Sequence, residues 1–507
     1  MTRRFWWGMM ASLPLLGCAS DDSAGAHRSC EPGATVSCAC IGGGQGTQAC
    51  RADGKGYEAC LGCDGSGGAA GAGGSASGGA SGAGGSGGAF TGKRTGAVTL
   101  DGNSLRDDQG RFNALGATMM WAAWGFKNDR ARLEQNLQWL SQHGFHYIRA
   151  LGVVGDYGAA DYWDGREIDW HWPDYDAVIA GLTDLCYDTY GLRVEWTLIG
   201  DGQKNLPNAG ERQALVDRFV AMSQGRSQKI IHFELANEAW QNGFDGSAGQ
   251  AELRALTQDL NSKSSILVAA SAPNPTDCGA TQALYAGGIA DIATLHFDRD
   301  VGQKDGHWRP VWQPWWVQGC AGVPVSSNNE PIGPGASVSS ENDALKLVAG
   351  AAMSFVSGLP LHVFHSSAGV RGDANLWEMS GADAFVAISS YVPPDVASWQ
   401  RKDPKQADAP LRIFAEEGGQ PKPDQTWPEL GQAESGVVAA YGAQNGKSFV
   451  MLPIGVLNHV KLEARAALTL DVVDLISGAV VSQHALAQGE SFTLSGAEAR
   501  WLRGTLQ

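Results

Sequence analysis

Phe233-Glu234-Leu235-Ala236-Asn237-Glu238 is a mostly apolar stretch that ends in an Asn-Glu pair, and Pro324-Val325-Ser326-Ser327-Asn328-Asn329-Glu330 ends in the same pair later in the chain. Each stretch is typical of a buried β-strand that runs into a polar loop. They belong to the fourth and the seventh of eight candidate strands. The eight candidates span residues 112–117, 147–153, 192–199, 229–235, 265–270, 292–297, 323–327 and 361–365.

Helical patterns lie between several of these candidate strands. The clearest covers Asp129–Leu140, where Leu133, Leu137 and Leu140 form one apolar stripe. Eight strands that alternate with helices over about 300 residues predict an α/β fold of the (β/α)8 TIM-barrel type. A doubly wound sheet is the alternative, but its Gly-rich phosphate turn is missing after the first strand.

The pattern changes after Pro410. Short alternating stretches follow, and Asn445-Gly446 and Ser477-Gly478 between them are typical turn sequences. We therefore expect a small C-terminal β-sandwich, with a structural role. Its candidate strands span residues 437–441, 448–452, 467–474, 480–484 and 491–494.

The N-terminus predicts export. Arg3 and Arg4 precede an apolar run of about thirteen residues, as in a secretory signal peptide. Its end, Leu15-Leu16-Gly17-Cys18, resembles a bacterial lipobox, in which the cysteine becomes the lipidated N-terminus. A buried helix is the alternative, but polar, Gly-rich sequence follows at once. We expect an exported protein that is held by a lipid on Cys18 at the outer membrane or cell surface.

Export makes disulfides possible. Six cysteines cluster between Cys30 and Cys63, and a segment this short would need bridges to fold. Their connectivity stays open, and half a zinc site at Cys60-x-x-Cys63 is the alternative. Cys278 and Cys320 could pair across neighbouring loops, whereas Cys186 lies in a helical pattern and is expected as a buried free thiol.

These signals divide the 507 residues into five segments. Residues 65–89 contain only Gly, Ala and Ser, a composition typical of a flexible linker. The expected segments are a signal peptide with lipobox (1–18), a Cys-rich, disulfide-rich segment (19–64), the linker (65–90), the catalytic barrel (91–405) and the β-sandwich (406–507).

The composition limits the partners. The formal net charge of −16 argues against a nucleic-acid partner, which requires a basic surface. The 18 tryptophans indicate a ligand with flat apolar faces, such as a sugar ring. The sequence contains no His-x-His cluster of the kind that would indicate a metalloenzyme. We expect no cofactor and no metal, a membrane contact only through the lipid, and a monomer.

The Asn-Glu pairs indicate the chemistry. In a TIM barrel the active site lies at the C-terminal ends of the strands. Two glutamates at strand ends are what glycoside hydrolysis needs, one to protonate the leaving oxygen and one to attack the anomeric carbon or activate a water. A pair of ordinary loop carboxylates is the alternative reading of Glu238 and Glu330.

The stretch Phe233–Glu238 resembles the fourth-strand motif of clan A glycoside hydrolases, the cellulase- and mannanase-like retaining barrel enzymes. The resemblance covers the barrel and implies that Glu238 is the acid/base and Glu330 the nucleophile. It also implies that Asn237 binds the sugar 2-hydroxyl. The second-strand Arg of the clan corresponds to Arg149, and its sixth-strand His corresponds to His296.

Two positions depart from the clan pattern. Ala239 stands where the clan often has Pro, and Asp298 stands where many members have a Tyr that bonds the nucleophile. Arg149 could instead form only a buried ion pair, and His296 could be a core histidine. Glu234 lies four residues before Glu238, so both side chains could point into the barrel. We interpret Glu234 as a structural residue or as one that contacts the site residues. His365, at the end of the eighth strand, is a further site candidate.

Tryptophans follow several candidate strands, where substrate loops would lie. We expect Trp121, Trp240, Trp312 and Trp316 to stack on sugar rings, although core packing is the alternative for several of them. The cluster at residues 307–316 shows no helical or strand period, which favours a cleft lining.

The sequence thus predicts a retaining glycoside hydrolase that acts on β-linked glycans, with a poly- or oligosaccharide as substrate. The alternative is a non-catalytic, carbohydrate-binding surface lipoprotein on an inactive barrel.

Overall fold

The computed structural model describes residues 33–40, 44–49, 93–155, 162–200, 205–297, 308–335, 341–417, 420–422, 437–455, 460–494 and 498–507. The chain forms two compact units, residues 1–83 and 84–507. In the first unit, β1 (Thr35–Cys40) and β2 (Gly44–Ala49) pair as an antiparallel hairpin. Cys18, the linker and the side chains of the Cys-rich segment lie outside what is described, so the statements about them stay predictions.

The second unit is built on the predicted barrel. Eight parallel strands follow one another in the order β10-β9-β8-β7-β6-β13-β12-β11. The backbone N–H groups of Asp291 and Ile292 donate to the carbonyl of Val268 (2.9 and 3.2 Å), which connects the two ends of this sheet. The strands are β6 (Ala114–Thr118), β7 (Tyr147–Val153), β8 (Arg193–Ile199), β9 (Ile230–Ala236), β10 (Val268–Ala269), β11 (Ala293–Leu295), β12 (Ser326–Asn328) and β13 (Leu361–Phe364).

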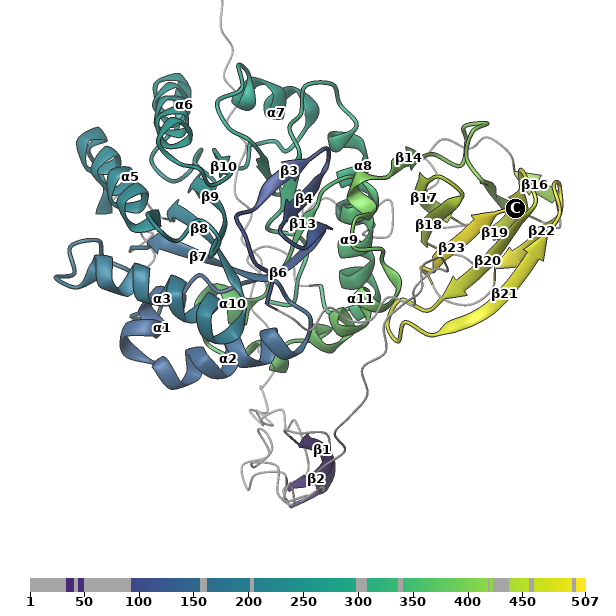
Figure 1. The fold of residues 1–507 in the computed structure, drawn as a ribbon, viewed down its shortest axis with the longest axis horizontal. Coiled ribbons are helices and arrows are strands. Elements are labelled where there is room, and N and C mark those ends of the chain that lie inside the picture. The colour runs from purple at the N-terminus through teal and green to yellow at the C-terminus, as the bar shows by residue number, and fades with distance from the viewer. Residues whose placement is uncertain are drawn as a thin grey trace, which may run out of the picture. The chain divides into compact units, whose positions relative to one another are not determined.

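Helices cover the outside of this sheet (Figure 1). The predicted helix at 129–140 is observed as α2, and Asp129 caps its N-terminus by accepting from the N–H of Arg132. The larger helices are α1 (Ala122–Asn128), α2 (Arg130–Gln142), α3 (Tyr175–Tyr190), α5 (Ala209–Ser223), α6 (Gly246–Lys263), α7 (Cys278–Tyr285), α8 (Arg309–Gln318) and α9 (Ala344–Val356). Shorter ones are α10 (Ser367–Arg371), α11 (Ile388–Tyr391) and the 3₁₀ turns η1 (Leu376–Glu378), η2 (Ala382–Ala387) and η3 (Val396–Ser398).

The strands alternate between the helix layer and the barrel interior, as strands with two buried faces do. On β8, Val194, Trp196 and Leu198 belong to the large apolar cluster under the helices. Glu195 and Thr197 point the other way and are fully buried. The barrel interior therefore contains a polar layer, which must satisfy its own charges and hydrogen bonds.

A small antiparallel sheet closes the base of the barrel. It comprises β3 (Thr99–Asp101), β4 (Ser104–Asp107) and β5 (Gly110–Phe112). Leu105 and Phe112 pack there with Tyr147 and Leu361 from the barrel strands. The prediction that the first barrel strand begins at residue 112 was wrong, because Phe112 ends this sheet and β6 begins at Ala114.

The predicted β-sandwich follows the barrel and lies beside α8 and α9 (Figure 1). Its sheets have the orders β14-β17-β18-β23-β20-β21 and β16-β15-β19-β22. Because β14 already pairs with β17, the sandwich begins at residue 400 and not at 406. The strands are β14 (Gln400–Lys402), β15 (Leu411–Glu417), β16 (Gln420–Lys422), β17 (Val437–Asn445), β18 (Ser448–Gly455), β19 (Val460–Ala464), β20 (Leu468–Val473), β21 (Val480–Leu486), β22 (Ser491–Leu494) and β23 (Trp501–Leu506).

The larger sheet of the sandwich has two apolar faces. Phe449 and Met451 of β18 belong to the core between the two sheets. Val450 and Leu452, on the other face of the same strand, belong to the cluster that also contains the barrel core. The barrel and the sandwich therefore share one continuous apolar core.

The cysteine predictions for the second unit are confirmed. Cys278 at the start of α7 and Cys320 just after α8 form a disulfide. Cys186 is a buried free thiol in α3, and burial raises its pKa.

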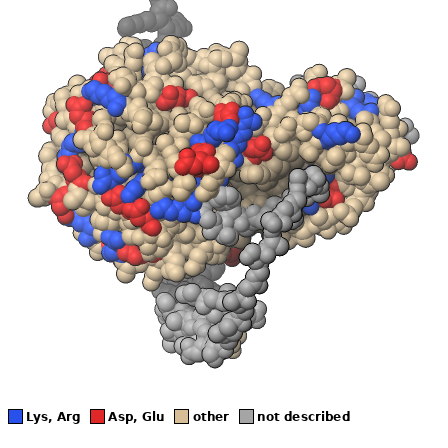
Figure 2. Space-filling model, in the orientation of Figure 1, with Lys and Arg blue, Asp and Glu red and all other residues tan. Residues whose placement is uncertain are grey.

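The surface carries both signs of charge. On the face drawn in Figure 2, Lys and Arg lie among Asp and Glu, and neither sign forms a separate patch. Among the described residues, no helix has the length and apolar character needed to cross a membrane.

Candidate active site

The candidate site residues meet at one rim of the barrel. Asn237 and Glu238 directly follow β9, His296 follows β11, and Glu330 lies two residues after β12. Because the strands are parallel, their C-terminal ends lie at the same end of the barrel. Arg149 reaches this group from within β7. The structure thus brings together the residues that the two Asn-Glu motifs predicted.

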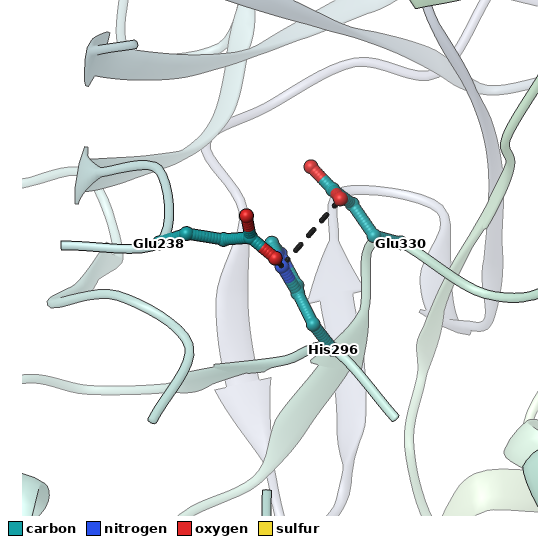
Figure 3. Close-up of side chains that lie close together, drawn as sticks. All are labelled: Glu238, His296 and Glu330. Atoms are coloured by element: carbon teal, nitrogen blue, oxygen red, sulfur yellow. Dashed lines mark hydrogen bonds and ion pairs between the residues drawn. The ribbon is translucent and has the colours of Figure 1, made fainter. Parts of the chain in front are cut away.

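Glu238 and Glu330 lie on either side of His296 (Figure 3). The His296 Nδ1 atom is 3.1 Å from Glu238 Oε1 and 3.6 Å from Glu330 Oε2. One oxygen of each carboxylate and one nitrogen of His296 all lie within 4.8 Å of one another. Glu330 is buried and Glu238 half-buried, so the two carboxylates have different environments.

The backbone at Glu238 is in an unusual conformation. Its φ of +37° is in the left-handed region, which non-glycine residues seldom occupy. The next residue, Ala239, donates its N–H to Ser271 Oγ (3.0 Å), and the Gln241 amide donates to the Glu238 carboxylate. Such conformations cluster at functional sites, where the surrounding contacts hold them.

Arg149 connects the two Asn-Glu motifs. Its side chain is fully buried, and it donates to Glu330 Oε1 (2.6 Å), Glu234 Oε2 (2.9 Å) and Asn237 Oδ1 (2.7 Å). Burial alone would lower the pKa of this guanidinium, but Glu234, Glu330 and Glu195 raise it above its usual value. Arg149 is therefore a permanent positive charge beside Glu330. Because Arg149 occupies the oxygen of Asn237, the amide N–H₂ of Asn237 remains the group that could donate to a ligand.

His365 also lies near Glu330. Its Nε2 atom is 4.0 Å from Glu330 Oε2, and its Nδ1 atom is 2.9 Å from Thr118 Oγ1. The structure thus places this sequence candidate beside the site. Asp298, where many clan A members have a Tyr, lies outside the described residues.

Several buried polar residues at the site were missed by the sequence reasoning. Thr197 donates to Glu234 Oε2 (2.6 Å), and Asn329 donates to Glu195 Oε1 (3.2 Å). His232 Nε2 is 3.4 Å from the same Glu195 oxygen. The signal was the polar pair Glu195 and Thr197 at a spacing of two within an otherwise apolar strand, which places both inside the barrel.

The tryptophans divide into two groups. Trp121 and Trp312 are buried, and Trp121 donates its indole N–H to the carbonyl of Ala368 (3.0 Å). Trp240 and Trp316 are 42% and 45% exposed, so only these two of the four stacking candidates offer a ring to a ligand. Trp316 donates its indole N–H to the hydroxyl of Tyr441 (2.8 Å) and therefore lies where the barrel meets the sandwich.

The prediction of an irregular cleft lining at 307–316 was wrong for residues 308–316, which the structure describes. Residues Arg309–Gln318 form α8. Pro310 lies in the first turn, where its missing N–H costs no hydrogen bond, and the helix continues through Pro314. These two prolines concealed the helical period in the sequence.

Glu238, His296 and Glu330 are also the residues that could hold a metal ion, since their ligand atoms lie within 4.8 Å. Arg149, at 2.6 Å from Glu330, opposes a second positive charge at that carboxylate.

Comparisons with known proteins identify the fold. No protein-family model matches the sequence, and no curated protein matches it. Among solved structures, one described as a glycoside hydrolase matches with a TM-score of 0.54 and 12% identity, over 81% of this chain and 97% of that chain. Two others have lower scores. A family 39 glycoside hydrolase from the gut symbiont Bacteroides cellulosilyticus has a TM-score of 0.43 and 10% identity, covering 80% of this chain and 86% of its own. An exo-β-1,4-mannosidase from an Opitutaceae bacterium has a TM-score of 0.42 and 15% identity, covering 57% and 62%.

At 12% identity, the first of these matches establishes the architecture and no more. The chain is similar in fold to a solved glycoside hydrolase over nearly the whole of that protein.

Proposed function

We propose that the protein is a retaining glycoside hydrolase that uses Glu238 and Glu330. The observation that carries this proposal is the approach of the two carboxylates, which have one oxygen each within 4.8 Å. In retaining enzymes the carboxyl groups are about 5–5.5 Å apart, whereas inverting enzymes leave about 6.5–9.5 Å for a water. The sequence resemblance to clan A supports a β-linked glycan as substrate.

Glu330 suits the role of nucleophile. A nucleophilic carboxylate must be ionised, and Glu330 accepts a hydrogen bond from the permanent cation Arg149. Its other oxygen faces His296 and His365. These contacts hold the carboxylate in one orientation toward Glu238.

Glu238 suits the role of acid and base. It is more exposed than Glu330, and its hydrogen-bond partners are His296 and Gln241. Glycosylation of Glu330 removes the negative charge beside Glu238 before the second step. Glu238 would thus protonate the leaving oxygen while Glu330 attacks the anomeric carbon. It would then take a proton from the water that releases the sugar with retained configuration.

Substitutions at the two glutamates test this proposal on an aryl β-glycoside. Glu330→Gln should be almost inactive on any substrate, because the glycosyl-enzyme cannot form. Glu238→Ala should still be glycosylated by the activated substrate but should stall there. Azide should restore turnover of Glu238→Ala with retained configuration, whereas azide with Glu330→Ala should give the inverted product. Glu252→Gln, on the outer helix α6, is the matched control and should keep the wild-type rate.

Exchanged rescue outcomes would reverse the two roles. Wild-type rates in both variants on a confirmed substrate would place the chemistry elsewhere. Binding of a glycan without any hydrolysis would instead support the alternative, a carbohydrate-binding protein on an inactive barrel.

We further propose that the enzyme works outside the cell while it is tethered by a lipid on Cys18. The disulfide between Cys278 and Cys320 supports an oxidising compartment. The replacement Cys18→Ser should abolish lipid labelling and release the protein from membranes. Unchanged labelling and fractionation would exclude the anchor.

A further inference from the structure

Glu195 is a fully buried carboxylate that the proposed mechanism does not use. It lies on β8 and points into the barrel interior. A buried carboxylate is retained only with partners that offset its loss of hydration. Its Oε1 atom accepts from the Asn329 amide (3.2 Å) and lies 3.3 Å from Arg149 Nε and 3.4 Å from His232 Nε2.

Two of these partners lead directly to the candidate nucleophile. The Arg149 guanidinium faces Glu195 with its Nε atom and donates to Glu330 Oε1 from its Nη1 atom. Asn329 precedes Glu330 in the chain, so its side-chain bond to Glu195 holds the backbone from which Glu330 projects. Glu195 thus acts on Glu330 both through its side-chain partner and through its neighbour in sequence.

The charges around this contact are unevenly balanced. Arg149 is one cation that faces three buried carboxylates, Glu195, Glu234 and Glu330. Among the described residues, Tyr147 on β7 and His232 on β9 also face Glu195, and His296, His365 and Glu238 face Glu330. Each further carboxylate around Arg149 repels the charge of Glu330 and so offsets part of the attraction that this guanidinium exerts on it.

We infer that Glu195 is a positioning residue that orients Glu330 through Asn329 and tunes its ionisation through Arg149. This inference rests on the proposed function of Glu330 as nucleophile. Glu195 has no place in the reacting pair itself, and its effect passes through the two partners.

The test removes the charge of Glu195 while it keeps the shape. Glu195→Gln should lower the pH at which Glu330 is half-protonated, because one negative charge is lost from around Arg149. Because Glu195 and Glu330 contact the same guanidinium, their two charges interact at short range, and a shift of about one to two pH units is expected. The substitution is made in the wild type and in a His232→Gln background, which removes the imidazole beside Glu195.

Two measurements distinguish failure of this inference from failure of the proposed function. The first is carbodiimide labelling of Glu330 as a function of pH, mapped by mass spectrometry, which requires no activity. The second is the acidic limb of the kcat/KM profile on the substrate of the wild type. Both should move to lower pH together. Wild-type protein that cleaves no glycan would contradict the proposed function, while the labelling profile would still decide the inference.

Asp107→Asn is the matched control. Asp107 is a buried carboxylate with arginine partners near the base of the barrel, so its loss should lower stability and leave the labelling profile unchanged. Glu195→Asp keeps the charge but shortens the reach to Asn329, so kcat should fall about tenfold without a pH shift. A folded Glu195→Gln variant with wild-type profiles in both backgrounds would overturn the inference. If Glu195→Gln does not fold, wild-type kcat in Glu195→Asp would overturn it.

Discussion

Replacement of Arg149 by Met should show how strongly the polar layer of the barrel depends on one cation. Met has a similar length and fills the space, but it leaves Glu195, Glu234 and Glu330 without their shared partner. Breaking a buried ion pair by removing one side costs about 3–5 kcal/mol, because an uncompensated charge stays buried. For about 400 residues the unfolding entropy is roughly 0.8–0.9 kcal/mol/K, so Tm should fall by about 4–6 °C at neutral pH.

The loss should depend on pH in a defined direction. Burial alone would raise the pKa of Glu195, but His232 and Arg149 hold it below its usual value. A carboxylate with a lowered folded pKa stabilises the protein above its unfolded pKa of about 4.3, and this contribution is lost as the pH falls through the folded pKa. Without Arg149 the Glu195 carboxyl protonates at higher pH. The gap in Tm between wild type and Arg149→Met should therefore be largest near pH 7.5 and should narrow toward pH 4.

Thermal unfolding followed by tryptophan fluorescence at both pH values measures this gap. Arg106→Met is the matched control, because Arg106 forms an exposed ion pair with Asp101. In this variant Asp101 retains its second partner, Arg111. Its Tm should change little. An Arg149→Met gap that is equal at both pH values, or no larger than that of the control, would refute the reasoning.

Three further predictions concern contacts away from the reacting pair. Burial alone would raise the pKa of Asp107, but its arginine partners lower it, so Asp107→Asn should destabilise the protein above about pH 4 and progressively less below it, as measured by Tm against pH. Replacement of both Cys278 and Cys320 by Ser removes a bridge across 42 residues and should cost about 2–4 kcal/mol, which denaturant unfolding with and without reductant can measure. Tyr441→Phe removes the acceptor for the Trp316 indole and should lower the unfolding free energy by about 0.5–1.5 kcal/mol, as measured by denaturant unfolding.

The barrel could be predicted from the sequence because its strands are short apolar runs that end in polar residues. All eight candidate ranges overlap an observed barrel strand, and the Asn-Glu pairs at 237–238 and 329–330 lie where the motif implies. Strand order along the chain was enough to place Glu238 and Glu330 at one rim, since parallel strands share their C-terminal end.

The remaining features depend on contacts between distant segments. Glu195 lies within a strand rather than at its end, and only the barrel closure brings it to Arg149 and Asn329. The indole N–H of buried Trp121 donates to the carbonyl of Ala368, far along the chain. The sandwich begins early because β14 pairs with β17, which is a partner that local patterns cannot specify.

The apolar core shared by the barrel and the sandwich has a consequence for how the protein can be divided. Val450 and Leu452 face the barrel side, and Phe449 and Met451 face the second sheet, so each face of β18 is covered by a different layer. A barrel truncated at residue 399 would expose the surface of α9 to water, and an isolated sandwich would expose its larger sheet. The two layers should therefore melt in one calorimetric transition and exchange their innermost amide protons at similar rates. Grafting this sandwich onto another enzyme would transfer a half-exposed sheet rather than a self-contained module.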